Sequence, residues 1–364
     1  MSYNIGNTDV NMRIDAVIGE DDVALYNVKQ KPFELYGLYD PLNQAEFKRL
    51  PDDVGNSTSE GISRLYKNTA GGRVRFSTDS KYVAIKAVMN CVCKIPHMTM
   101  CASAGFALYI DDPSTGESRF WRVFKPPINM TDGYESKISF ETSEMRYFTI
   151  CFPSYSNVSE LYVGVDKHSH VGEGMPYRNI LPIVYYGSSI TQGASACHSG
   201  NAYENIISRH INTDFINLGF SGSAHGEEIL AKYMSTLDMS IFVCDYDHNA
   251  QNPQELKKTH FRLYEIIRQR CPDVPYIMIT RPDFPPAINR KSYDNSVGCR
   301  IVVIDSYNKA IRLGDKNVYF IDGSNIFKGQ LEELCTVDGI HPNDLGFHLM
   351  AETVEHTIRS ILFT

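Results

Sequence analysis

The amino-acid sequence predicts two domains, a β-sandwich followed by an α/β domain with three layers. Residues 30–166 consist of short alternating apolar runs broken by turn residues, a pattern typical of antiparallel sandwiches and jelly rolls. From residue 178 onward, apolar strands alternate with amphipathic helices, which indicates a parallel sheet covered on both faces. A polar, glycine-containing stretch at residues 168–176 separates the two patterns. We therefore expect a β-sandwich domain over residues 1–176 and an α/β/α domain over residues 177–364.

The sandwich prediction depends on many apolar runs at close spacing, in which no helical period is sustained. The clearest runs are residues 81–89, 105–110, 120–124, 146–150 and 160–165. Trp121, the single tryptophan, lies in one of them. It could stack on a sugar ring, but a core or interface position is the expectation. The stretch at 168–176 is expected to be an exposed linker.

The α/β prediction depends on five buried strands and four helices. The strands are expected at residues 180–186, 215–218, 241–245, 276–280 and 318–321. Helices are expected where apolar side chains recur at helical spacing, at residues 201–210, 253–269, 299–313 and 344–362. Parallel sheets of this kind bind ligands at the carboxyl ends of their strands. The loops that follow the strands should therefore carry the chemistry.

The composition narrows the classes of partner. The 364 residues carry a formal net charge of -8, which argues against nucleic-acid or anionic-membrane binding, because both need a basic face. The N-terminus is polar and no run is long enough to span a membrane, so we expect a cytoplasmic protein. The nine cysteines are scattered and are expected to be reduced, buried thiols rather than metal ligands.

Three residues near the strand ends are of the types that a serine hydrolase needs. Asp338 and His341 lie three residues apart, a spacing that places both side chains on one side of a helical turn. A carboxylate beside an imidazole fixes the tautomer and stabilises the imidazolium. Ser189 follows the first predicted strand and reaches the same sheet edge, where His341 can take its proton. These three are the candidate catalytic residues.

Acyl transfer also needs hydrogen-bond donors for the oxyanion. The candidate donors are the backbone N–H groups of Ser189 and Gly222 and the side-chain amide of Asn249. Gly222 has no side chain that could block the substrate's approach. We expect these three donors to surround the reacting carbonyl.

Asp247, His248 and Arg281 follow the third and fourth predicted strands, which makes them candidates for binding substrate. A guanidinium at that place could reach a substrate oxygen or carboxylate. Arg281 could equally fix its proline-rich loop through Asp283, and His248 could be a local hydrogen-bond partner. Both interpretations stay open for these residues.

Each motif also has a structural interpretation when taken singly. Ser188 or Ser189 could cap a helix. The glycine-rich residues 217–223 could be mistaken for a phosphate cradle, but they lack the lysine of a P-loop. Asp338 could be a turn residue before a proline-led helix. The common position of all these segments at the strand ends of one domain favours an active site.

The chain from about residue 180 to its end resembles the SGNH/GDSL hydrolase family. The first block of that family is usually G-D-S and reads Gly187-Ser188-Ser189 here, so that Ser189 matches the nucleophile and Ser188 replaces the aspartate. The block D-x-x-H near the end matches Asp338 and His341.

The two middle blocks match less closely. The glycine of the second block matches Gly222, with Gly219 as a rival. The third block, usually G-x-N-D, is replaced by residues 245–249, which end on Asn249. The resemblance implies that Asn249 holds the oxyanion.

The resemblance implies a flavodoxin-like α/β/α fold and a serine ester hydrolase that works through an acyl-enzyme, without metal or cofactor. It also implies that small acyl groups, such as acetyl, are removed from an oligosaccharide or another small ester. The N-terminal half looks like the β-sandwich that accompanies some bacterial carbohydrate esterases. Two alternatives are a non-catalytic carbohydrate-binding or scaffold protein with the same fold, and a phosphoesterase, which would need metal ligands or a basic phosphate cradle.

Overall fold

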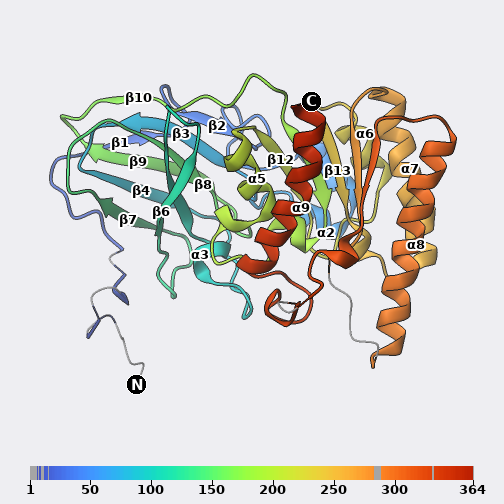
Figure 1. The fold of residues 1–364 in the computed structure, drawn as a ribbon. Helices are drawn as coiled ribbons and strands as arrows, with labels where there is room; N and C mark the ends of the chain where they lie inside the picture. The colour runs from blue at the N-terminus through green and yellow to red at the C-terminus, as the bar shows by residue number, and fades with distance from the viewer. Residues whose placement is uncertain are drawn as a thin grey trace.

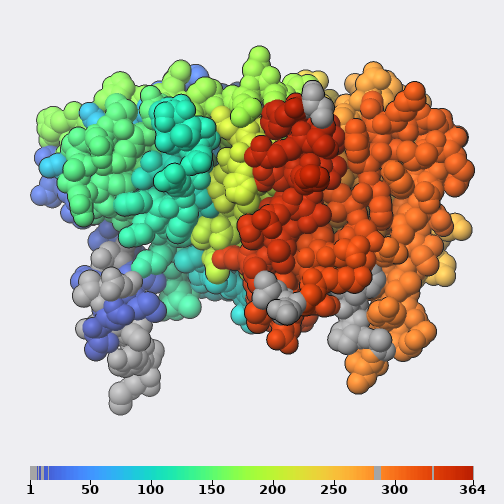
Figure 2. Space-filling model, in the orientation of Figure 1, coloured from blue at the N-terminus to red at the C-terminus, as the bar shows by residue number. Residues whose placement is uncertain are grey.

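The protein is described from a computed structural model, in which residues 6, 8–9, 12–14, 16–282, 288–329 and 332–363 are placed. The N-terminal half contains two antiparallel sheets, and the C-terminal half contains one parallel sheet with helices on both sides (Figure 1). The two halves lie side by side in the space-filling view (Figure 2). The predicted fold class, a β-sandwich followed by an α/β/α domain, is confirmed.

The two sheets of the sandwich share one apolar core. One sheet has the strand order β1-β9-β4-β7, and the other has the order β10-β3-β8-β5-β6, with β2 paired to β3. Phe76 of β3, Ile85 of β4 and Phe148 of β8 are fully buried in the cluster between the sheets. The strands are β1 (Val23–Asn27), β2 (Glu34–Tyr36), β3 (Arg73–Thr78), β4 (Tyr82–Val88), β5 (Phe106–Asp111), β6 (Ser118–Phe124), β7 (Gly133–Ser139), β8 (Arg146–Cys151), β9 (Glu160–Asp166) and β10 (Val171–Glu173).

The N-terminal half contains features that the sequence pattern did not indicate. The half contains helices α1 (Asp52–Thr58), α2 (Glu60–Leu65) and α3 (Met100–Ser103), which are too short to show a helical period. The stretch at 168–176 is not only a linker, because β10 pairs with β3 there. Trp121 is 37% exposed on β6, at the edge of its sheet. The domain boundary at residue 176 stays a prediction.

The C-terminal sheet is parallel throughout and has the order β12-β11-β13-β14-β15. Numbered within this half, the order is 2-1-3-4-5, which is that of flavodoxin-like folds. The buried strands are rich in apolar residues on both faces, as the sequence pattern predicts. Their bounds are β11 (Ile183–Gly187), β12 (Phe215–Gly219), β13 (Ile241–Asp245), β14 (Tyr276–Ile279) and β15 (Val318–Ile321).

Helices cover both faces of this sheet (Figure 1). One face packs on α5 (Tyr203–Ile211) and α9 (Asp344–Leu362). The other packs on α6 (Glu228–Met234), α7 (Pro253–Arg270) and α8 (Arg290–Arg312). Helix α8 begins well before the expected residue 299. Its first turns were not predicted because they are polar and carry no apolar period. The short helical segments are α4 (Ser189–Gln192), η3 (Ser199–Asn201), η4 (Asp247–Asn249), η5 (Gly323–Asn325) and η6 (Glu332–Leu334).

Part of the N-terminal half completes the core of the C-terminal half. Leu50, Ile62 and Tyr66 are buried in the cluster formed by α6, α7, α8 and the sheet. Arg73 of β3 is buried and forms an ion pair with Asp214, just before β12. The two halves therefore share apolar and charged contacts. Without the N-terminal half, part of the core of the C-terminal half would be exposed.

Arg49 is buried among these contacts, with 1% of its surface exposed. Its guanidinium donates to the carbonyl oxygens of Asn68 at 2.8 Å and Leu65 at 2.7 Å in the N-terminal half. It also donates to those of Asn217 at 3.3 Å and Gly219 at 2.6 Å, at the end of β12. A buried cation of this kind is tolerated because its N–H groups are satisfied. Arg49 therefore ties the N-terminal half to the carboxyl end of the parallel sheet.

The remaining expectations concern thiols and membranes. Cys151, Cys244, Cys299 and Cys335 are buried, as expected, whereas Cys91 and Cys197 are exposed. Among the residues that the structure describes, no helix is long and apolar enough to cross a membrane.

Replacing Arg49 with methionine should lower the free energy of unfolding by roughly 3 kcal/mol or more, because buried carbonyl groups in both halves lose their donor. Urea denaturation measures this. The matched control is Arg64→Met on α2, where the exposed arginine pairs only with Glu60 and the change should stay within about 0.5 kcal/mol. Equal stability of the two variants would contradict the role given to Arg49.

Candidate active site

Ser189 lies in the tight turn that joins β11 to α4. It is the first residue of α4, and the Ser188 hydroxyl caps this helix by accepting from the Ile190 N–H at 3.2 Å. The capping interpretation therefore applies to Ser188. The Ser189 side chain instead turns toward His341, with 3.0 Å between Oγ and Nε2. Ser189 is only 6% exposed.

Asp338 and His341 are brought together by a turn after β15. The Asp338 carboxylate accepts from the backbone N–H of Ile340 at 3.0 Å and of His341 at 2.8 Å, which closes the turn. Its other oxygen lies 2.7 Å from Nδ1 of the His341 ring. One continuous chain of hydrogen bonds therefore runs from Ser189 through His341 to Asp338.

The charge of Asp338 decides which nitrogen of His341 carries the proton. Burial raises the pKa of Asp338, but hydrogen bonds from the His341 ring and from two backbone N–H groups outweigh it, so that the pKa lies below its usual value. The carboxylate stays ionised and can only accept hydrogen bonds. Nδ1 of His341 must therefore be the donor, which leaves Nε2 to accept from the Ser189 hydroxyl. This is the arrangement that activates a serine nucleophile.

Gly222 and Gly219 have different structural roles. Gly222 has φ +63, and a Cβ built there meets no atom within 4 Å. The turn therefore needs glycine for its left-handed backbone rather than for space, which corrects the reason expected from the sequence. A Cβ on Gly219 would lie 2.3 Å from the Gln192 nitrogen of α4. Gly219 is thus a packing glycine, while Gly222 lines the cleft beside Ser189.

Asn249 also lines this cleft, but its side chain holds a loop. Its Nδ2 donates to the carbonyl oxygens of Phe220 at 3.1 Å and Ala224 at 3.2 Å. Both amide hydrogens are therefore directed at the loop that contains Gly222, and not at an open position in front of Ser189. Serving as the third oxyanion donor would require Asn249 to release one of these bonds.

The three candidate substrate-binding residues contact one another. The Arg281 backbone N–H donates to the buried Asp247 carboxylate at 3.1 Å, and Nη2 of Arg281 lies 3.0 Å from Nε2 of His248. These contacts join the ends of β13 and β14. His248 and Arg281 border the cleft, whereas Asp247 is buried behind it. Asp283, the other expected partner of Arg281, lies outside the described residues.

The cleft in front of Ser189 has a volume of about 690 Å³. One wall of this cleft comes from the residues around the start of α8, which no sequence motif indicated. Asn289, Ser292, Asn295 and Ser296 line it. Their spacing of three and four residues is the signal that could have identified this polar helix face.

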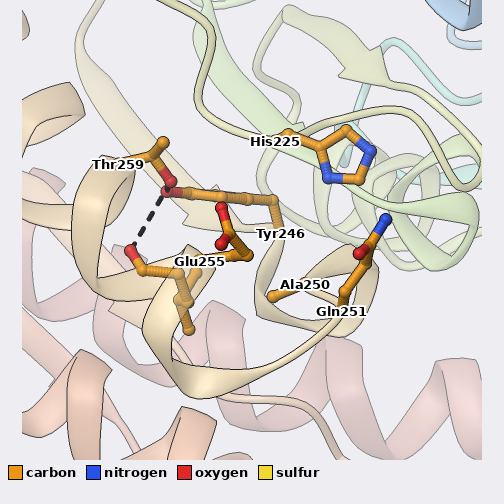
Figure 3. Close-up of a pocket in the computed structure, with 7 residues that line it drawn as sticks. His225, Tyr246, Ala250, Gln251, Glu255 and Thr259 are labelled. Atoms are coloured by element: carbon orange, nitrogen blue, oxygen red, sulfur yellow. Dashed lines mark hydrogen bonds between the residues drawn. The ribbon is translucent and has the colours of Figure 1, made fainter.

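A second hollow of about 200 Å³ adjoins this cleft at Ala250, which borders both (Figure 3). In Figure 3, His225 and Gln251 approach each other on one side of the hollow. The hydroxyl groups of Tyr246 and Thr259 lie 2.9 Å apart on the other side. Ser189 and its partners do not border this hollow, so we place the chemistry in the larger cleft.

Comparison with known families agrees with this geometry. The profile of the GDSL-like lipase/acylhydrolase family matches residues 181–359. A profile for the N-terminus of SGNH-hydrolase-type esterases matches residues 23–171. The chain belongs to the GDSL-like lipase/acylhydrolase family. It is accordingly an ester-bond hydrolase. No curated protein matches the sequence.

Solved structures resemble this GDSL-like hydrolase over nearly its whole length. A protein from Bacteroides ovatus described as a GDSL-like lipase has 28% identity and a TM-score of 0.84, covering 93% of this chain and 98% of its own. The salicylyl-acyltransferase SsfX3 of a tetracycline biosynthetic pathway has 16% identity and a TM-score of 0.75, with coverages of 94% and 99%. A family two carbohydrate esterase from Clostridium thermocellum, solved with cellohexaose, has 15% identity and a TM-score of 0.61, with coverages of 90% and 98%.

The N-terminal half also reaches the catalytic residues of this hydrolase. The exposed ring of His97 stacks on that of His341, with 5.2 Å between the ring centroids and 26° between the planes. Tyr155 donates from its hydroxyl to the Ser189 carbonyl at 3.4 Å. Neither residue belongs to a motif, so neither contact could be predicted from the sequence.

The two hydrogen bonds of Asn249 to the Gly222 loop predict an effect on stability. Asn249→Ala should lower the free energy of unfolding by about 1–3 kcal/mol, because two carbonyl groups of the Gly222 loop lose their donor. Chemical denaturation measures the change. Asn295→Ala, in the same cleft on α8, is the control and should stay within about 0.5 kcal/mol. A side chain that served only as an oxyanion donor would leave the stability unchanged when removed.

Proposed function

We propose that the protein removes small acyl groups, such as acetyl, from a hydroxylated substrate through an acyl-enzyme on Ser189. The hydrogen-bond chain from Ser189 through His341 to Asp338 carries the proposal. Ser189 Oγ attacks the ester carbonyl while Nε2 of His341 takes the hydroxyl proton. His341 then gives this proton to the leaving alcohol, and a water molecule repeats the sequence to free the acid. Asp338 orients the ring and stabilises the imidazolium.

The oxyanion is held by backbone donors in this proposal. The N–H of Ser189 is at the first position of α4, where a helix offers N–H groups that have no partner within it. Gly222, whose left-handed backbone requires glycine, lines the same cleft, and its N–H is the second donor in this proposal. Asn249 acts mainly by holding that turn. Fixed donors of this kind stabilise the charge that develops in the transition state.

The lining of the cleft supports a hydroxylated alcohol as the leaving group. Hydroxyl and amide side chains around the start of α8 line the same cleft as Ser189, and such groups pair well with sugar hydroxyls. A carbohydrate esterase of similar fold was solved with cellohexaose, which agrees with an oligosaccharide ester. A long acyl chain would find few apolar side chains here.

Ser189→Ala should lower the release of p-nitrophenol from p-nitrophenyl acetate by about 10³-fold or more, because the nucleophile is lost. The rate is followed by absorbance, and circular dichroism checks the fold. The neighbouring variant Ser188→Ala is the control. It should retain most of the activity and lose about 1 kcal/mol of stability with the helix cap. Undiminished turnover by Ser189→Ala would refute the assignment.

Ser292→Leu should distinguish recognition of the sugar from recognition of the acyl group. The leucine fills the α8 side of the cleft, so kcat/KM for acetylated oligosaccharides should fall by about tenfold or more, as when a recognised hydroxyl loses its partner. Turnover of p-nitrophenyl acetate should change little, since this small ester does not need that wall. A parallel loss on both substrates would argue against sugar recognition by α8.

A further inference from the structure

We propose that His97, Asp338 and His341 form a zinc-binding site through which Zn²⁺ reversibly switches the hydrolase off. The metal site is inferred from the geometry of the three side chains alone, and only its effect on turnover rests on the proposed function. Zinc is here an inhibitor rather than a cofactor, since His341 cannot bind the metal and serve Ser189 at the same time.

The three side chains present suitable ligand atoms. One nitrogen from each histidine and one carboxylate oxygen of Asp338 all lie within 4.8 Å of one another. Within the described part of the chain, no other three histidine, cysteine, aspartate or glutamate side chains gather as closely. Two imidazoles and one carboxylate are a common ligand set for Zn²⁺, with water at the fourth position.

The three ligand atoms, now within 4.8 Å of one another, must shift slightly to reach the geometry of a zinc site. Zinc holds nitrogen and oxygen ligands at about 2.0–2.2 Å, so neighbouring ligands are roughly 3.3 Å apart in a tetrahedral site. The exposed His97 ring must turn from its stacked position on His341 toward Asp338. The backbone beneath it is fixed, since the Ser195 hydroxyl donates to the His97 carbonyl at 3.2 Å and Thr99 Oγ1 donates to the Cys197 carbonyl at 2.6 Å. In addition, His341 Nδ1 and the Asp338 oxygen, which lie 2.7 Å apart, must separate by roughly 0.6 Å to bind the same zinc ion.

Zinc would remove the basic nitrogen that Ser189 needs. Nδ1 is the nitrogen of His341 that faces Asp338, and it is the one available to a metal shared with that carboxylate. A neutral imidazole bound through Nδ1 carries its proton on Nε2. That N–H then donates to Ser189 Oγ at the observed 3.0 Å, which is the outer-shell contact that metal-bound histidines usually form. Nε2 can no longer accept the serine proton.

The site depends on both halves of the chain. His97 comes from the segment between β4 and α3, whereas the other two ligands follow β15. The stacking of His97 on His341 already holds the two imidazoles together. Zinc binding would therefore start from two imidazoles that are already in contact.

Calorimetric titration of the Ser189→Ala variant with zinc chloride tests the site without reference to turnover. One Zn²⁺ should bind, and adding His97→Phe should weaken binding at least tenfold, because phenylalanine keeps the ring contact but has no ligand atom. Ser189→Ala with His225→Phe is the matched control, since His225 is an exposed histidine outside the cluster, and it should bind as the parent does. His97→Gln serves in the same way if the phenylalanine variant does not fold. Equal zinc affinity with and without His97 would overturn the proposal.

Inhibition of the wild-type hydrolysis of p-nitrophenyl acetate provides the second measurement. Zinc should lower the rate at least tenfold at saturation, and a chelator should restore it. The His97→Phe variant should need at least ten times more zinc for the same fractional loss of its own rate. Zinc binding through His97 without any loss of rate would overturn the inhibitory role. A lack of esterase activity would refute the proposed function and leave the calorimetric test of the site intact.

Discussion

The buried guanidinium of Arg49 is the contact on which the geometry of the site most depends. It joins carbonyl groups of Asn68 and Leu65 to those of Asn217 and Gly219, so the end of β12 is fixed from the N-terminal half. The ring of Phe220 lies over the same guanidinium, 4.6 Å away. The turn that contains Gly222 begins directly after Gly219, the last residue that Arg49 contacts on this strand. The sandwich is therefore a structural part of the hydrolase and more than an appended module.

The helix that begins at Ser189 is also fixed by contacts with the N-terminal half. Gln192 of α4 donates to the Asn68 side chain at 3.0 Å and accepts from the Ser221 N–H at 2.9 Å. A side chain of the serine helix therefore connects the N-terminal half to the oxyanion turn. The Asp338–His341 turn joins this network through the contact of His341 with Ser189, and the His97 ring stacks on it from the N-terminal half. Preorganised donors and a fixed base are what a serine hydrolase needs from its scaffold.

Local patterns predicted the parts of the structure that depend on local forces. The parallel sheet followed from apolar strands alternating with amphipathic helices, and Asp338 and His341 followed from a three-residue spacing within one turn. Parts that depend on contacts distant in sequence could not be read in this way. His97 reaches His341, and Arg49 reaches Gly219, only because the two halves pack together. The early start of α8 was missed because its polar turns face the cleft rather than a core.

The central claim is that Ser189 forms an acyl-enzyme, and mass spectrometry after rapid mixing with p-nitrophenyl acetate tests it most directly. Acid quenching during turnover should trap protein heavier by one acetyl group. Peptide mapping should place that group on Ser189, and the Ser189→Ala variant should remain unmodified. Acetylation of another residue such as Ser188, or turnover without any acetylated protein under conditions that trap such an intermediate, would contradict the account.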